Sequence, residues 1–406
     1  MRTAIIICEY NPFHSGHARL ISEARRDGCE RVVCIMSGNF VQRGEPAASD
    51  AYTRAKAACL GGADLVFELP LRYACGSAEF FALGGVMTAK ALGISGELWF
   101  GSECGNTEKL SEIAERQMTS EFAECAAELH RGNMGFAEAQ SEAYDKIYGK
   151  EESLCRPNDI LAVEYLKALR RCGSALVPRT IKRCGNYLSE KVSPGEAFAS
   201  STALRALIYD GKTDEIARFM PEKSFKALTD GEKKGLFPTD MKKYRNILFS
   251  FARLADAAEI SRFDGAYGGL AAYIVSAARS SCCTDDFFAS LPTKKYTDSR
   301  LRRTLLASVL RITRDDRRKA PEYVRLLAAN SRGREALAEI KRGGGLPVIS
   351  RQSELSALIS ASCAEKRKNI TAMCGMDFRA DSLFGMCLPL PKDAGFFARG
   401  TPFVEE

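Results

Sequence analysis

The chain begins with a strand, a turn and a helix in close succession, and this succession limits the folds that it can adopt. The apolar run from Ala4 to Cys8 is short, rich in branched side chains and followed by a turn with Pro12 and Gly16, which predicts a buried parallel strand. Residues 17 to 26 have a helical pattern. A glycine-containing turn between a strand and a helix N-terminus leaves backbone N–H groups free to bind an anion. We therefore expect a phosphate site directly after the first strand.

Two of the three histidines in the 406-residue chain, His14 and His17, lie in this turn. Imidazole N–H groups placed there can donate to phosphate oxygens, on which negative charge grows during attack at phosphorus. The pair therefore predicts a nucleotidyl-transfer site with His14 and His17 as catalytic residues. The alternative is that they are hydrogen-bonded turn residues in a chance match, but their place after the first strand favours the phosphate site.

Strand-like and helical segments alternate along the first half of the chain. The strand-like runs are residues 31–36, 64–68, 97–100 and, more briefly, 175–177, and the helical stretches are 50–60, 74–91 and 160–171. Alternation of this kind predicts an α/β, Rossmann-like parallel sheet with helices on both faces. Polar motifs follow four of the predicted strands, at the edge where such sheets bind ligands.

The length predicts two domains. We expect residues 1–207 to form a nucleotidyltransferase-like catalytic domain, with a helical insertion at about residues 106–150. After residue 207 we find no strand pattern, so residues 208–406 are expected to form a mainly helical domain. That domain ends in a Phe-rich tail with Gly and Pro residues, for which the sequence allows no structural prediction.

Positive charge is concentrated in the second half. Between Lys294 and Arg342, fifteen Lys and Arg residues stand against six Asp and Glu residues, a net charge of +9 in a chain whose total is +7. Segregated charge of this kind is typical of a surface that binds a phosphate backbone. The candidate nucleic-acid contacts are Lys294, Lys295, Arg300, Arg302 and Arg303. The alternative is a solvated helix face, or arginines that pair with acids of their own domain.

Composition argues against several other classes of protein. The fifteen cysteines include no CxxC pair, so we expect neither a disulfide framework nor a protein-bound metal site. No stretch approaches the roughly 20 apolar residues that span a membrane, and no signal peptide pattern is present. We expect a cytoplasmic protein with no membrane partner, whose oligomeric state the sequence does not predict.

A second phosphate motif occurs near the end of the predicted catalytic domain. In the segment from Phe198 to Arg205, hydroxyl side chains can cap a helix whose first amides and Arg205 bind phosphates. Alone, this is an ordinary capping box. Together with the histidine turn it resembles the second signature of the HxGH nucleotidyltransferase superfamily. The candidate ATP contacts in this segment are Ser200, Ser201, Thr202 and Arg205.

The amino-acid sequences of several motifs closely resemble those of the bacterial tRNA(Met) cytidine acetate ligase family. The matching segments are residues 9–14, 37–47, 64–70, 100–103, 157–161, 181–183 and 323–327. The resemblance implies an enzyme that activates acetate with ATP to acetyl-adenylate. The acetyl group would then pass to N4 of the wobble cytidine of elongator tRNA(Met), giving N4-acetylcytidine. ATP, acetate and this tRNA are the implied partners, with Mg²⁺ to neutralise the phosphates.

The resemblance also assigns site residues. The implied ATP contacts are Ile7, Cys8, Glu9, Tyr10, Asn11, Pro12, Phe13, His14, Ser15, Gly16, His17, Ala18, Arg19, Leu20, Gly101, Asn158 and Arg183. The loop after the second strand supplies the expected acetate contacts Ser37, Gly38, Asn39, Gln42 and Arg43, of which Arg43 is a catalytic clamp or, alternatively, an exposed turn residue. One departure is Asp50-Ala51, where the family pattern would have a lysine; Arg54 or Lys56 could replace it.

Two other functions compete with this interpretation. A small-molecule adenylyltransferase of the same superfamily explains both phosphate motifs but leaves the basic segment without a purpose. A non-catalytic, nucleotide-sensing RNA-binding protein explains the basic segment but would not require both histidines.

Overall fold

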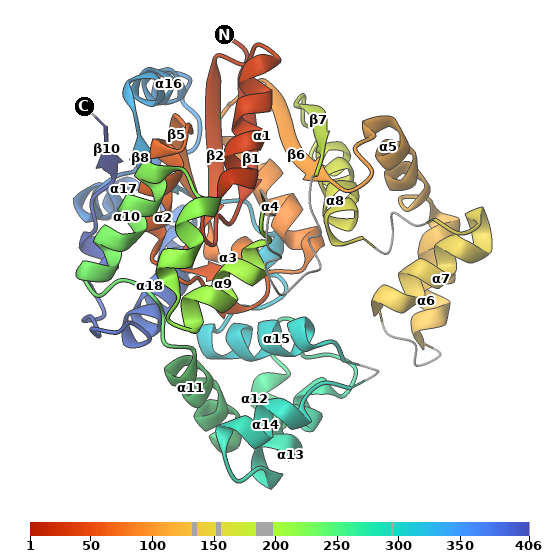
Figure 1. The fold of residues 1–406 in the computed structure, drawn as a ribbon. Coiled ribbons are helices and arrows are strands. Elements are labelled where there is room, and N and C mark those ends of the chain that lie inside the picture. The colour runs from red at the N-terminus through yellow and green to blue at the C-terminus, as the bar shows by residue number, and fades with distance from the viewer. Residues whose placement is uncertain (132–135, 152–155, 184–197, 294–295, 406) are drawn as a thin grey trace.

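The computed structural model describes residues 1–131, 136–151, 156–183, 198–293 and 296–405. Its centre is an eight-stranded sheet of order β10-β8-β5-β2-β1-β6-β7, with β9 paired to β8 (Figure 1). The strands are β1 (Thr3–Cys8), β2 (Arg31–Ser37), β5 (Leu65–Leu69), β6 (Glu97–Ser102), β7 (Val177–Lys182), β8 (Val324–Ala329), β9 (Val348–Ile349) and β10 (Phe403–Val404). Neighbouring strands run parallel except β5 and β8. The predicted α/β fold with a parallel sheet is confirmed.

Helices cover both faces of the sheet. Alternate side chains of β1 point to opposite sides, so that Ile5 and Ile7 belong to one core while Ala4 and Ile6 belong to another. The first core includes residues of α3 (Leu71–Ala74), α4 (Ala78–Ala91) and α8 (Pro157–Arg171), and the second includes residues of α1 (Ser15–Arg26) and α2 (Ala51–Leu60). Burial on both faces explains why the first strand is a continuous apolar run.

Three helices occupy the stretch that we expected to be a helical insertion. They are α5 (Thr107–Arg116), α6 (Ser120–Arg131) and α7 (Phe136–Tyr148). Helices α6 and α7 project to one side of the molecule in Figure 1, beyond α8.

The prediction that no strand follows residue 207 is wrong. Strands β8, β9 and β10 come from the last third of the chain and extend the central sheet beyond β5. The six residues of β8 read VRLLAA, with no sustained alternation and with only one β-branched side chain, Val324. Pairing with β5, more than 250 residues earlier, determines this strand. The division at residue 207 stays a prediction, and the sheet is built from both sides of it.

Helices dominate the rest of the second half. They are α9 (Ser201–Tyr209), α10 (Glu222–Lys233), α11 (Met241–Leu254), α12 (Ala257–Ile260), α13 (Leu270–Ser280), α14 (Thr284–Ser290), α15 (Asp298–Leu310), α16 (Ser331–Arg342), α17 (Gln352–Ala361) and α18 (Ala364–Met386). Helices α11 to α15 form what we call the helical lobe, in which α15 lies between the sheet-bearing part and α12 to α14 (Figure 1). None of the described helices is long and apolar enough to cross a membrane.

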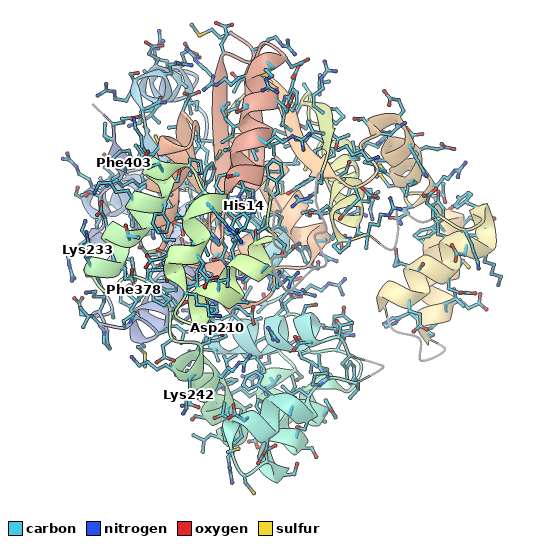
Figure 2. The ribbon with its side chains drawn as sticks, in the orientation of Figure 1. His14, Asp210, Lys233, Lys242, Phe378 and Phe403 are labelled. Atoms are coloured by element: carbon cyan, nitrogen blue, oxygen red, sulfur yellow. The ribbon has the colours of Figure 1, made fainter. Side chains whose placement is uncertain are left out.

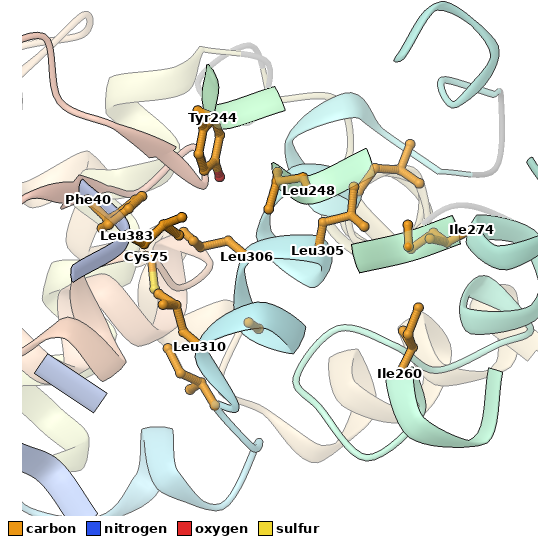
Figure 3. Close-up of a cluster of buried hydrophobic side chains, with 14 of the residues drawn as sticks. Phe40, Cys75, Tyr244, Leu248, Ile260, Ile274, Leu305, Leu306, Leu310 and Leu383 are labelled. Carbon is orange, nitrogen blue, oxygen red and sulfur yellow. The ribbon is translucent and has the colours of Figure 1, made fainter. Parts of the chain in front are cut away.

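The core of the helical lobe continues into the loop that follows β2. Figure 3 shows Leu305 and Leu306 of α15 between Phe40 on one side and Ile274 on the other. Phe40 lies in the small hairpin of β3 (Phe40–Val41) and β4 (Glu45–Pro46), and its ring is 6.0 Å from that of Tyr244 in α11. The helical lobe therefore supports the loop in which the acetate contacts were predicted.

Candidate functional site

A cavity of about 550 Å³ opens at the carboxyl ends of β1 and β6. The chain leaves β1 toward β2 on one side and returns to β6 on the other, which makes this edge the switch point of the sheet. The cavity is lined by Ile6, Ile7, Cys8, Glu9, Tyr10, Asn11, His17, Leu20, Gln42, Arg43, Ala78, Phe81, Trp99, Phe100, Gly101, Glu103, Arg156, Pro157, Asn158, Leu161, Tyr165, Arg183, Ser200, Ser201, Thr202 and Arg205. Both predicted phosphate motifs meet there.

The two histidines of the turn have different positions. His14, labelled in Figure 2, caps the N-terminus of α1. It is only 2% exposed, whereas His17 lies on the cavity wall. The N–H of Gly16 donates to Nδ1 of His14 over 3.0 Å, so the His14 proton is on Nε2, 3.0 Å from the Ser201 hydroxyl. A Cβ on Gly16 would lie 2.8 Å from Cε1 of His14, so only glycine fits in this cap.

The backbone also sets the tautomer of His17. The N–H of His14 donates to Nδ1 of His17 over 3.2 Å, which leaves Nε2 as the only ring donor. The two rings stack with centroids 3.7 Å apart. Burial, with the positive charges of Arg183 and Arg205, lowers the pKa of His14 to about 3. Burial, then His14 and Arg183, lowers the pKa of His17. Both rings are therefore neutral donors at neutral pH.

The lowered pKa of His14 predicts a loss of stability in acid. Below pH 6.5 the unfolded chain gains a proton at His14 that the folded protein does not take up, so the free energy of unfolding falls as the pH falls toward 3. At about 1.4 kcal/mol per pH unit, this loss reaches about 2 kcal/mol at pH 5. Urea unfolding at pH 7 and pH 5 should show a drop that is about 2 kcal/mol smaller in His14→Asn than in the wild type. An equal drop in both proteins would show that the pKa of His14 is not lowered in the folded protein.

The second phosphate motif forms the start of α9. Ser200 caps the helix by accepting from the N–H of Ala203 over 3.0 Å. Arg205 donates to the Asn11 carbonyl over 2.8 Å and to the Thr202 hydroxyl over 3.2 Å. With the bond from His14 to Ser201, these contacts join α9 to the histidine turn although almost 190 residues separate them in sequence.

Helix N-termini and guanidinium groups surround the cavity. Residues at the starts of α1, α8 and α9 line it, and each start supplies the positive end of a helix dipole. At the start of α8 the N–H groups of Asn158 and Asp159 already donate to Glu103. The charged side chains on its wall are Arg43, Arg156, Arg183 and Arg205 against Glu9 and Glu103. Such a set fits a polyanion such as a nucleoside triphosphate.

The predicted acetate loop divides into two parts. Gln42 and Arg43 lie on the cavity wall, while Ser37, Gly38 and Asn39 lie behind it. The side chain of Asn39 accepts from the N–H of Ala51 over 2.9 Å and donates to Asp381 over 2.8 Å. These three residues therefore shape the loop, and only its tip faces the cavity.

Neither candidate for the missing lysine reaches the cavity. Arg54 is buried and donates to the carbonyls of Ser49, Glu9, Ser37 and Gly38, so that it fastens the ends of β1 and β2 together. Lys56 lies 5.3 Å from the ring centroid of Phe403 in β10. Asp50 accepts from the N–H groups of Tyr52 and Thr53 as the cap of α2.

Sequence reasoning missed part of the cavity wall. Glu103 belongs to the matching segment 100–103 but was not predicted to be a site residue. Its carboxylate accepts from Nδ2 of Asn158 over 2.6 Å and from the N–H of Asp159 over 2.8 Å. The side chain of Asp159 in turn accepts a hydrogen bond from the N–H of Glu103 over 2.8 Å. This exchange fixes Asn158 at the rim. Phe81 and Tyr165 come from helices α4 and α8, where nothing in the sequence distinguishes a cavity residue from a core residue.

The predicted nucleic-acid contacts have separate surroundings. Lys294 and Lys295 lie outside the described residues. Arg302 pairs with Glu45 in the hairpin and donates from Nε to Asp298 over 2.9 Å. Burial lowers the pKa of Arg303 to about 10. Arg300 lies over the ring of Tyr267, with 4.2 Å between the guanidinium carbon and the ring centroid.

Within the described ranges, no group of three or more His, Cys, Asp or Glu side chains is arranged to hold a metal ion. A cation that enters with a nucleotide would need phosphate oxygens as its main ligands, as Mg²⁺ in nucleotide sites commonly does.

Comparisons with known proteins identify the family and the fold. The profile of a family described as HIGH Nucleotidyl Transferase matches residues 1–394. A protein of Acetivibrio thermocellus named tRNA(Met) cytidine acetate ligase is 33% identical over 423 residues, covering 100% of this chain and 99% of the relative. A protein of the same name from Clostridium perfringens is 36% identical, covering 86% and 89%. A crystal structure of Thermotoga maritima TmcAL bound with alpha-thio ATP has a TM-score of 0.90 at 29% identity, with 100% of both chains covered.

Proposed function

We propose that this chain, which belongs to the HIGH nucleotidyl transferase family and within it to the tRNA(Met) cytidine acetate ligases, joins acetate to N4 of the wobble cytidine of elongator tRNA(Met) at the expense of ATP. The observation that carries the proposal is the cavity wall. It brings the Nε2 donor of His17, three helix starts and four arginines together at the switch point of the sheet. We place the reaction in the cytoplasm, where tRNA is modified.

In the first step an acetate oxygen attacks the α-phosphorus of ATP. A new phosphorus–oxygen bond forms, the bond between the α-phosphorus and its bridging oxygen breaks, and pyrophosphate leaves. His17 donates to the phosphate oxygens as charge grows on them, while Arg205 and the start of α9 hold the leaving phosphates. His14 positions Ser201 and the ring of His17. Mg²⁺ bound to the triphosphate supplies further charge neutralisation.

In the second step N4 of the cytidine attacks the acetyl carbon. The bond from that carbon to the phosphate oxygen breaks, AMP leaves with the electron pair, and N4 loses a proton. Arg43, at the tip of the loop, is the group that we assign to the acetate carboxylate. No protein nucleophile is required, because the adenylate is already activated.

The product identifies the function. Elongator tRNA(Met) transcript, ATP, acetate and Mg²⁺ are incubated with the protein, and the nucleosides are analysed by mass spectrometry. We expect N4-acetylcytidine and an equal amount of AMP, and neither product from a transcript whose wobble cytidine is replaced by uridine. Pyrophosphate release that needs neither acetate nor tRNA, with the AMP moiety joined to an added small molecule, would favour a small-molecule adenylyltransferase, and absence of any nucleotide turnover would favour a non-catalytic nucleotide-binding protein.

A further inference from the structure

An exposed aromatic side chain lies among cations in the helical lobe. Tyr267, between α12 and α13, is 45% exposed. The guanidinium of Arg300 lies 4.2 Å from its ring centroid and that of Arg314 lies 5.9 Å from it. Large exposed aromatic side chains flanked by arginine are the elements with which proteins bind single-stranded nucleic acid.

The backbone around Tyr267 is fixed before any partner binds. Arg300 donates to the carbonyls of Gly265 and Tyr267 over 3.3 and 3.0 Å. The N–H of Asp264 donates to the carbonyl of Ile312 over 2.9 Å, which joins this loop to the segment that carries Arg314. The ring is therefore held in place, and its immobilisation costs little when a base stacks on it.

The surface around the ring is positively charged. The exposed cations of the two joined segments, apart from Lys319, are Arg262, Arg311, Arg314 and Arg318. Two of the nearby acids are engaged within the protein, Asp264 with Arg317 and Asp316 with Lys319, while Asp315 is exposed. The excess of cations suits a phosphate backbone.

This surface adjoins the catalytic cavity through α15. On one side of this helix Arg300 contacts Tyr267; on the other, Arg302 pairs with Glu45 in the hairpin that presents Arg43 to the cavity. The contact is close, because a Cβ on Gly44 would lie 2.6 Å from the backbone nitrogen of Arg303. A single helix, α15, therefore lies between the exposed ring and the hairpin that carries Arg43.

We infer that Tyr267 is a stacking platform for an unpaired nucleotide of the tRNA anticodon loop, and that Arg314 binds a phosphate beside it. The inference rests on the proposed function and adds the place and the manner of RNA binding. A loop that must present its wobble base to the cavity has other unpaired bases within a few nucleotides of it, and their faces are available for stacking.

Replacement of Tyr267 by alanine tests whether its ring stacks on a tRNA base. Tyr267→Ala should weaken tRNA binding about 10- to 100-fold and raise the KM for tRNA to match, whereas Tyr267→Phe, which keeps the ring, should remain near the wild type. The affinity for ATP should not change in either variant. An unchanged KM for tRNA in Tyr267→Ala would overturn the inference while leaving the function intact. A wild-type protein that acetylates no tRNA would overturn both.

The salt dependence of tRNA binding tests whether Arg314 binds a phosphate. Arg314→Ala should lower the slope of log Kd for tRNA against log salt by about one unit, since one phosphate contact is lost. Arg253→Ala is the matched control, because Arg253 is an exposed arginine of the same lobe that lies over Phe249. Equal slopes in the two variants would overturn the role of Arg314. Thermal melting of each variant separates lost contacts from lost folding.

Discussion

Replacement of His17 by alanine is expected to slow the acetate- and ATP-dependent formation of AMP about 100- to 1000-fold. His17 lies on the cavity wall with Nδ1 occupied by the N–H of His14, so that its one ring donor is held ready for a phosphate oxygen. Loss of a preorganised donor of this kind commonly costs about 3 kcal/mol of transition-state stabilisation. The effect should appear in kcat more than in the affinity for ATP, because the charge grows only in the transition state.

The third histidine provides the control. His130 lies in α6, outside the cavity wall, and His130→Ala should keep the wild-type rate. Single-turnover kinetics at saturating ATP, with thermal melting of each variant, would measure the chemical step and the folding separately. A His17→Ala protein that is folded and forms AMP at the wild-type rate would contradict the assignment of the phosphate site.

Replacement of Arg325 by methionine is expected to lower the free energy of unfolding by about 3–5 kcal/mol. Its guanidinium lies 3.1 Å from Asp381 and 3.3 Å from Glu68, behind the loop that carries Arg43. Burial raises the pKa of Glu68 to about 7, even beside this arginine. Without Arg325, the two carboxylates would remain in the interior without the cation with which both form ion pairs, and either their burial or their protonation costs stability.

An exposed arginine of the following helix is the matched control for this change. Arg332→Met, in α16, should alter stability by less than about 0.5 kcal/mol. Urea denaturation followed by circular dichroism provides both values. The triple variant with Glu68→Gln and Asp381→Asn should recover part of the loss, because it removes the charges that Arg325 neutralised. A loss in Arg325→Met no larger than that of the control would show that the buried pairs do not stabilise the fold.

The sequence predicts those elements of the fold whose own residues carry a helix or strand pattern. The run from Ala4 to Cys8 is apolar at every position because the strand is buried on both faces, and the helix start that follows is determined by its own cap. Strand β8 has no such signal, since its place beside β5 depends on residues far away in the chain. Long-range pairing of this kind leaves no periodicity to read.

The same distinction applies to the site. His17 and Ser201 were predicted because each begins a helix with a recognisable motif, and the structure brings the two helix starts together. Asn39 was assigned to the cavity because it lies in a polar loop, but its side chain turns to Asp381, on a helix more than 300 residues later. Arg302 belongs to the basic stretch, yet its partner Glu45 lies in the hairpin. Direction of a side chain, unlike its place in a motif, is decided by tertiary contacts.

The most direct test of acetyl-adenylate formation follows the oxygen atoms of acetate into the products. Acetate labelled with ¹⁸O in both carboxylate positions is incubated with the protein, ATP and elongator tRNA(Met), and the nucleotide products are analysed by mass spectrometry. Attack of acetate on the α-phosphorus followed by transfer of the acetyl group leaves one labelled oxygen in each AMP. We therefore predict AMP with a single ¹⁸O, formed in step with N4-acetylcytidine and dependent on His17. Unlabelled AMP, or the label in inorganic phosphate together with ADP, would contradict acetyl-adenylate formation in this cavity.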